Sequence, residues 1–236
     1  MIRLLLFLSL IFGNGYLLAQ NTVRQQLIDN AAVEYLKAAG SQSPLYSGKL
    51  QEGHQRVSNH PYLTDERYAK SRLSYSGVIY PEVLLRLDLS RDELVIQSPD
   101  YHNIVLLSEN VDFAELHGQT IVYFNRDSLQ GCPPSGYYIQ LHSGKCKVLV
   151  RKSARLELKS SGYQHNYTCS TTTNYYLYKD EVYYTIRNKR ELLKVLQLYR
   201  RELRQFISNA NLQFRHDAAK FIQQTVGEYE KLSGAL

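Results

Sequence analysis

The spacing of apolar residues constrains the fold of this chain more than any other feature. Between Ala69 and Ile186 apolar residues recur at every second position, and turn-forming residues arrive about every eight to twelve positions. The clearest run is Val83, Leu85, Leu87 and Leu89. Because successive side chains of a strand point to opposite faces, this pattern predicts a series of short antiparallel strands, each with one buried face.

Two hairpins can be located within this region. A turn at 90–92 separates the run that ends at Leu89 from the apolar residues 94–96. A two-residue loop at either 179–180 or 180–181 joins 175–178 to 182–186 and puts the apolar residues of both strands on one side. Further expected strands are 73–80, 104–107, 113–117, 120–124, 136–142, 147–150 and 154–158. Residues 159–172 are polar, rich in Ser and Thr and without alternation, which predicts a loop.

Helical periodicity appears on both sides of the sheet region. From the N-cap candidate Thr22 to Ala39, apolar residues recur every three or four positions, and Gly40 follows as a stop signal. These stripe residues are Leu27, Ala31, Tyr35 and Ala38. Residues 189–232 show the same period, with a break near 209–211. The predicted fold class is α+β: mainly an antiparallel sheet (69–187), as a curved sheet or partial barrel, with an N-terminal helix (22–39) and two or three C-terminal helices (189–232).

The first nineteen residues have the pattern of a secretory signal peptide. Arg3 is followed by the apolar run 4–12 and then by the sequence that ends at Ala19, where we expect cleavage. The run is too short to span a bilayer, and no later stretch is long enough, so no transmembrane helix is expected in the mature chain. An uncleaved anchor is the alternative. We therefore expect one mature domain, 20–236, exported to the periplasm or associated with the outer membrane, including its cell-surface side.

The charge balance argues against a nucleic-acid partner. The chain carries 28 Lys and Arg against 22 Asp and Glu, a net charge of +6, and the leader accounts for one Arg. An excess this small, in an exported protein without a recognisable nucleic-acid module, is not typical of nucleic-acid binders. An envelope protein or an outer-membrane component is the expected partner, with lipid or glycan as alternatives.

The three cysteines do not form a recognisable disulfide scaffold or metal motif. Cys132, Cys146 and Cys169 are odd in number, so an intramolecular disulfide would leave one thiol over. Their spacing contains no C-x-x-C pair, which argues against a zinc module or a thioredoxin-like redox pair. Cys146 lies in an apolar hairpin, which favours a small buried residue over a nucleophile.

No catalytic or cofactor motif occurs in the sequence. The serine-hydrolase elbow, the phosphate-binding loop and the dinucleotide-binding glycine pattern are all missing, and the seven histidines are scattered without zinc-ligand spacing. We therefore predict no catalytic residue, no cofactor and no metal ligand. A carboxylate pair assembled from distant strands stays open.

Exposed tyrosines and a basic helix face are the candidate partner-binding residues. The chain has 20 tyrosines and no tryptophan, and tyrosine serves both as a strand former and as an amphipathic contact residue. The candidates are Tyr176, Tyr178, Tyr183, Arg200, Arg201 and Arg204. A structural role for the tyrosines, and a solvated face for the arginines, are the alternatives.

The segments 175–184, 188–193 and 202–207, followed by Leu212-Gln213-Phe214, together resemble an uncharacterised family of exported Bacteroidota proteins. In that family a Tyr-rich hairpin leads into a Lys-rich helix pair that ends in a Leu-x-Phe element. The resemblance implies export and this architecture, and it supplies no catalytic residue. Asp127-Ser128-Leu129 also resembles the O-glycosylation signal of exported proteins from that group, which makes Ser128 a candidate glycosylation site.

These observations favour an exported, non-enzymatic envelope protein that acts as a binding or assembly module. The first alternative is a carrier or sensor of an apolar ligand such as lipid, since an antiparallel sheet with helices can enclose a pocket. The second is a hydrolase without a recognisable motif.

Overall fold

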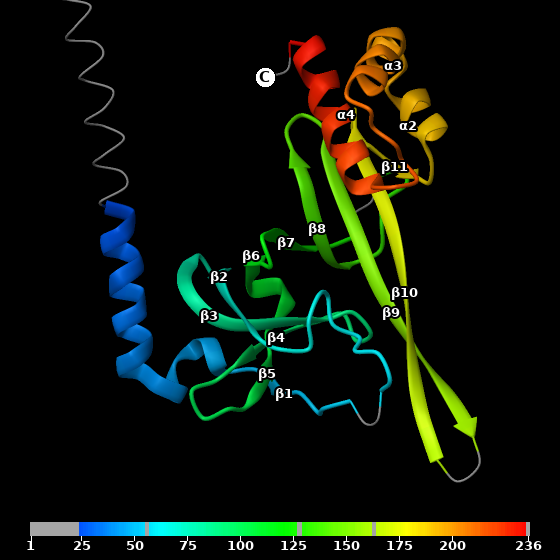
Figure 1. The fold of residues 1–236 in the computed structure, drawn as a ribbon. Helices are drawn as coiled ribbons and strands as arrows, with labels where there is room; N and C mark the ends of the chain where they lie inside the picture. Colours follow the sequence, from blue (N-terminus) through cyan, green and yellow to red (C-terminus); the bar gives the residue numbers. More distant parts are fainter. Residues whose placement is uncertain (1–23, 55–56, 127–128, 162–163, 235–236) are drawn as a thin grey trace, which may run out of the picture.

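One curved antiparallel sheet forms the body of the protein (Figure 1). The computed structural model describes residues 24–54, 57–126, 129–161 and 164–234. The sheet has eleven strands in the order β1-β5-β4-β3-β2-β6-β7-β8-β9-β10-β11 and is not closed into a barrel. The strands are β1 (Lys49–Leu50), β2 (Ala69–Tyr75), β3 (Val78–Asp88), β4 (Glu93–Gln97), β5 (Asn103–Val105), β6 (Val111–Leu116), β7 (Gln119–Phe124), β8 (Gly136–Ser143), β9 (Lys147–Ser161), β10 (Gln164–Lys179) and β11 (Val182–Ile186).

Helices stand at both ends of the chain, as expected. The N-terminal helix covers residues 24–39 of the described chain and runs beside the body, whereas the C-terminal helices gather over one end of β8–β11 (Figure 1). The remaining helices are η1 (Gly40–Gln42), η2 (Pro44–Tyr46), η3 (Ser108–Asn110), α2 (Lys189–Val195), η4 (Gln197–Tyr199), α3 (Arg200–Asn209) and α4 (Ala218–Leu232). The predicted α+β class, with its curved sheet and terminal helices, is confirmed.

Tight turns with left-handed residues set several strand boundaries. Ser76 and Gly77 have φ of 52° and 76°, which makes a two-residue turn between β2 and β3. The expected single strand 73–80 is therefore wrong, because Ser76-Gly77 reverses the chain within it. Asp180 and Glu181 have φ of 50° and 62° and form the β10–β11 loop, which is one of the two expected positions.

The expected loop at 159–172 is also wrong. Residues 147–161 and 164–179 pair with each other as β9 and β10 in continuous register. The alternation is missing because this part of the hairpin leaves the sheet, and Cys169 is its one buried residue among those whose exposure the structure describes. Thr168 and the Thr residues 171–173 favour strands through their β-branched side chains, so polarity alone misled the prediction.

The core has two large parts that share the sheet. Leu85, Leu94 and Ile121 belong to a cluster under strands β2–β7, and Val148 and Leu177 belong to a second cluster covered by α2–α4. The turn between β3 and β4 connects the two halves. Its carboxylate Asp92 accepts from Arg151 Nη2 at 3.0 Å and from the Tyr137 backbone N–H at 3.1 Å, and Ala154 N donates to Leu89 O at 2.9 Å.

Candidate functional site

The β9–β10 hairpin extends beyond its neighbouring strands as a two-stranded ribbon (Figure 1). β8 pairs with β9 only up to Val150, and β11 pairs with β10 only from Tyr175 onward. Past these points the two strands pair with each other. Near the base of the ribbon Ala154 N donates to Leu89 O, and farther out Ser58 N donates to Tyr167 O at 2.8 Å.

The outer part of this ribbon carries an exposed apolar pair. Leu158 and Tyr167 are direct cross-strand partners and are 53% and 37% exposed. On the opposite face of β9, Arg155 and Lys159 are exposed, and Glu157 between them lies 3.8 Å from Arg155. The ribbon therefore offers apolar side chains on one face and a mainly basic set on the other.

The buried carboxylate of Asp88 orders the loop that follows β1. Asp88 is fully buried, and its Oδ1 accepts from Ser90 N at 2.9 Å, from Ser90 Oγ at 2.7 Å and from Arg91 N at 3.2 Å. Its Oδ2 lies 2.5 Å from His54 Nε2 and accepts from Gln51 Nε2 at 3.2 Å. These contacts fix the segment around Gln51 and His54 against the β3–β4 turn.

Serine hydrolases also combine a serine, a histidine and an aspartate, but the geometry of Ser90, His54 and Asp88 differs from theirs. In a nucleophile–histidine–carboxylate relay the two ring nitrogens face different partners. Here His54 Nε2 faces both Asp88 and, at 3.5 Å, Ser90 Oγ, while the Ser90 hydroxyl already donates to Asp88. The arrangement orders a loop and does not activate Ser90.

An open cavity of about 800 Å³ adjoins this network. His54, His60, Tyr62, Glu66 and Arg86 are among its lining residues. The Arg86 guanidinium lies 3.9 Å from the ring centre of Tyr62, and it donates to Glu66 O at 3.0 Å. Arg86 Nη2 also donates to Gln51 Oε1 at 3.3 Å, whereas its buried Nε has no hydrogen-bond partner among the described residues.

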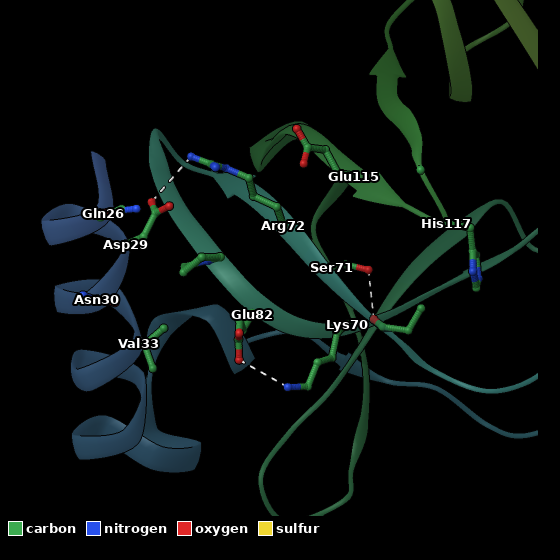
Figure 2. Close-up of a pocket in the computed structure, with 13 residues that line it drawn as sticks. Gln26, Asp29, Asn30, Val33, Lys70, Ser71, Arg72, Glu82, Glu115 and His117 are labelled. Atoms are coloured by element: carbon green, nitrogen blue, oxygen red, sulfur yellow. Dashed lines mark hydrogen bonds and ion pairs between the residues drawn. The ribbon is translucent and has the colours of Figure 1, made fainter. Parts of the chain in front are cut away.

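A second polar groove separates the N-terminal helix from the sheet (Figure 2). Its volume is about 730 Å³. Asp29 of the helix lies 3.6 Å from Arg72 of β2, and Lys70 of β2 lies 3.5 Å from Glu82 of β3. The groove is bounded by charged pairs and is not an apolar pocket.

At the opposite end of the molecule, buried Glu230 joins α4 to the β8–β9 turn. Its Oε1 accepts from Cys146 N at 2.6 Å, and its Oε2 lies 2.7 Å from His142 Nε2. Burial, reinforced by the charge of Glu230, raises the pKa of the Cys146 thiol to about 11. Cys146 is buried, as its hairpin position predicted, and a thiol with this pKa is a poor nucleophile at neutral pH.

The structure separates the predicted partner-binding residues into two places. Arg200, Arg201 and Arg204 are exposed on α3, at the end of the molecule away from the ribbon tip (Figure 1). Tyr176 and Tyr178 are half-buried, and Tyr183 is buried. These tyrosines pack with Phe124, Tyr138 and Leu149 on the sheet face opposite the C-terminal helices. The candidate glycosylation residue Ser128 and the predicted leader 1–19 lie outside the described residues.

No protein-family model, no curated protein and no solved structure matches this chain. In the part of the chain that the structure describes, no three His, Cys, Asp or Glu side chains come together as a metal site. Among the same residues no helix combines the length and apolar character needed to cross a bilayer. The functional argument therefore depends on geometry.

Sequence reasoning predicted strand 154–158 but missed its pairing with β10, and it also missed the Asp88 network. Asp88 occupies a polar position of an alternating strand, which normally faces solvent, and His54 is distant in sequence. A local signal for part of the network existed, because an Asp followed two residues later by Ser is typical of a turn in which the carboxylate accepts backbone N–H groups. Nothing local indicated His54.

Proposed function

We propose that this protein is a non-enzymatic binding module of the cell envelope, and that it docks a protein partner with an acidic surface through the outer part of the β9–β10 ribbon. The observation that carries the proposal is the exposed Leu158–Tyr167 pair in the outer ribbon, where β9 and β10 pair with each other and the segment 57–58 contacts β10 at Tyr167. An isolated two-stranded hairpin is only marginally stable in water, and exposed apolar pairs on such an element favour docking.

The charges of the ribbon support an acidic partner. Arg155 and Lys159 outnumber Glu157 on its basic face, and the whole chain has a net charge of +6. Charge complementarity of this kind raises association rates and selects partners, while the apolar pair supplies contact area that survives high salt. The exposed α3 residues Arg200, Arg201 and Arg204 provide a second basic surface at the far end.

The two alternative functions have weaker support. An apolar ligand needs an enclosed apolar cavity, whereas the two cavities described above are open and lined by charged pairs or polar side chains. A hydrolase needs an activated nucleophile, whereas the Ser90 hydroxyl donates to Asp88.

Site-specific photocrosslinking in intact cells tests the proposal. A photoreactive residue at position 158 should give one discrete protein adduct, and the same residue at Leu198, which is 71% exposed near α3, should not. The crosslinked protein, once purified, should bind the wild-type chain and lose about tenfold or more in affinity with Leu158→Asp or Arg155→Glu. Leu198→Asp is the matched control. Equal adducts from both positions, or unchanged affinity of the Leu158→Asp variant, would refute the proposal.

A further inference from the structure

The two long edges of the β9–β10 ribbon differ in what covers them. The outer edge of β10 contacts the chain at Ser58, whose N–H donates to Tyr167 O at 2.8 Å. The outer edge of β9 contacts the body at Ala154, whose N–H donates to Leu89 O at 2.9 Å. Beyond Ala154, the described residues make no further backbone hydrogen bond to this edge. Residues 155–161 of β9 therefore form an edge without a neighbouring strand (Figure 1).

The backbone groups of this free edge point outward at alternate residues. In an antiparallel pair, directly opposite residues exchange both backbone hydrogen bonds or neither. Tyr167 O accepts from Ser58 on the far side of β10, so the Leu158–Tyr167 pair exchanges neither. Leu158 therefore directs its N–H and C=O away from β10, as Ala154 does four residues earlier in the same unbroken register. The residues two positions before and after Leu158 do the same, so the edge offers donors and acceptors to another strand.

We propose that this edge pairs with the same edge of a second copy of the chain, antiparallel and with Leu158 on the two-fold axis. A two-fold dimer needs a surface that is complementary to itself. Leu158 is the central residue of the free edge 155–161, so pairing about it covers the whole edge in both copies. A centre nearer the base would bring the second copy onto the contact between Ala154 and Leu89, and a centre nearer the tip would leave edge residues uncovered.

The charges of β9 favour the same centre. Pairing about Leu158 puts Glu157 of each copy directly across from Lys159 of the other, on the face opposite Leu158. Both side chains are exposed, so the dimer has two cross-strand pairs of opposite charge. Pairing about Glu157 or about Lys159 would instead place like charges across the axis. A lysine on an edge strand normally discourages association, and Glu157 of the second copy offsets that effect.

The apolar face of the ribbon becomes continuous in this dimer. Leu158 lies beside Tyr167 within one copy and beside Leu158 of the second copy across the axis. One face of a four-stranded ribbon thus carries a row of four side chains, Tyr167 and Leu158 from each copy. Two strands alone are marginally stable in water, so the added strands also stabilise the ribbon. The proposed function uses the faces of the ribbon, whereas the dimer uses its edge, so the inference goes beyond that function.

Charge reversal tests the dimer in the processed chain recovered after export, with its N-terminus determined by mass spectrometry. Sedimentation equilibrium should give a mass that rises from that of one chain to that of two with concentration. Glu157→Lys and Lys159→Glu should each weaken dimerisation by about tenfold or more, because each change places two like-charged pairs across the axis. The double variant Glu157→Lys/Lys159→Glu restores opposite charges and should dimerise within about threefold of the wild type. Lys194→Glu, on an exposed position of α2, is the matched control and should have no effect.

Disulfide trapping tests the position of the axis. Directly opposite residues of a hydrogen-bonded antiparallel pair have Cα atoms about 5.5 Å apart, a separation that a disulfide can bridge. Leu158→Cys should therefore give a covalent dimer under mild oxidation, with the bond between the two positions 158 identified by peptide mass spectrometry. Leu198→Cys is the control, because Leu198 is 71% exposed on η4 and should give no such dimer.

Three results would overturn the inference. The first is the mass of one chain at every concentration up to about 1 mM, where even a weak dimer is detected. The second is a double charge variant that dimerises no better than the single variants. The third is an equal yield of disulfide dimer from positions 158 and 198.

Failure of the dimer is distinguishable from failure of the proposed function. Glu157→Lys adds positive charge to the basic face, so it should keep binding to an acidic partner while it weakens the dimer. In the photocrosslinking experiment, an adduct at position 158 that contains only this chain reports the dimer, and an adduct with a different protein reports the proposed function. Partner binding by a chain that stays monomeric would refute the dimer alone.

Discussion

The helices at the two ends of the chain have the same 3.6-residue spacing of apolar residues. The apolar side is buried in the C-terminal helices and exposed in the N-terminal helix. In α3 and α4 the stripe residues Leu203, Ile207 and Phe221 are buried against the sheet. In the N-terminal helix the stripe residues Leu27 and Tyr35 are half or more exposed. A 3.6-residue period thus predicts a helix with an apolar side, but it does not predict what that side contacts.

The sheet surface beneath each end explains the difference. Under α2–α4 the strands present Val148, Leu177 and Ile186, which are all buried there. Beside the N-terminal helix, β2 and β3 present the charged residues Arg72 and Glu82. The side of the helix that faces the body supplies Asp29 to the pair with Arg72 and Leu36 to the main core, and the side with Leu27 and Tyr35 is left exposed.

Removing a large side chain from each stripe should give the largest difference in the free energy of unfolding. Phe221→Ala should lower the free energy of unfolding by about 3–5 kcal/mol, because it leaves a cavity in a closed core. Leu27→Ala should change it by less than about 0.5 kcal/mol, because the side chain is exposed. Urea unfolding followed by circular dichroism measures both. Similar losses for the two variants would mean that the N-terminal stripe is buried in solution.

The Glu230 contact should account for a smaller part of the C-terminal stability. Glu230→Gln leaves one carbonyl oxygen where two oxygens now contact Cys146 N and His142, so we expect a loss of about 1–3 kcal/mol. Glu228→Gln on the same helix breaks only a partly exposed pair with Lys231 and should cost about 0–1 kcal/mol. Equal losses of unfolding free energy for Glu230→Gln and Glu228→Gln in urea would show that the buried contacts of Glu230 add no stability beyond that of an exposed pair.

Burial of the Cys146 thiol, reinforced by the charge of Glu230, predicts an alkaline loss of stability. Because the pKa of Cys146 is raised to about 11 in the folded protein, from an ordinary value of 9.0, the unfolded chain releases this proton first. Stability should therefore fall as pH rises from about 9 to about 11. The thermal midpoint of Cys146→Ala should fall less between about pH 8 and about pH 10 than that of the wild type. An identical pH slope for Cys146→Ala would contradict the prediction.

The smallest expected effect is a gain in stability from a substitution in the β10–β11 turn. Glu181 has φ of 62°, a conformation that costs an L-residue about 1–2 kcal/mol and that Gly adopts readily. After the extra entropy that Gly loses on folding, Glu181→Gly should stabilise the protein by about 0.5 kcal/mol in urea unfolding. Glu157→Gly, within a ribbon strand, should destabilise it. A loss at position 181 would show that the side chain makes a contact that outweighs the turn geometry.

The sequence predicted those elements whose local pattern coincides with their surroundings. The Tyr175–Ile186 hairpin is correct because both its strands face one core, and α2–α4 are correct because their stripe is buried. Residues 159–172 of the ribbon were predicted to be a loop because most of their side chains are polar and exposed, and alternation appears only where one face is buried. The orientation of the N-terminal helix depended on the charges of β2 and β3, which the helix sequence does not contain.

The candidate site was less predictable for a related reason. Arg200, Arg201 and Arg204 are exposed on a helix, as local periodicity suggested, but Tyr183 is buried by a packing that joins distant strands. Asp88 and His54 meet only because the β3–β4 turn and the preceding loop fold together.

Hydrogen–deuterium exchange of the processed chain tests the difference between the two ends most directly. The amides of residues 24–39 should exchange early, because the stripe residues Leu27 and Tyr35 are exposed and a helix with few buried apolar contacts opens at low free energy. The amides of α4 should exchange slowly, because its stripe is buried. Equal protection of both helices would contradict the account.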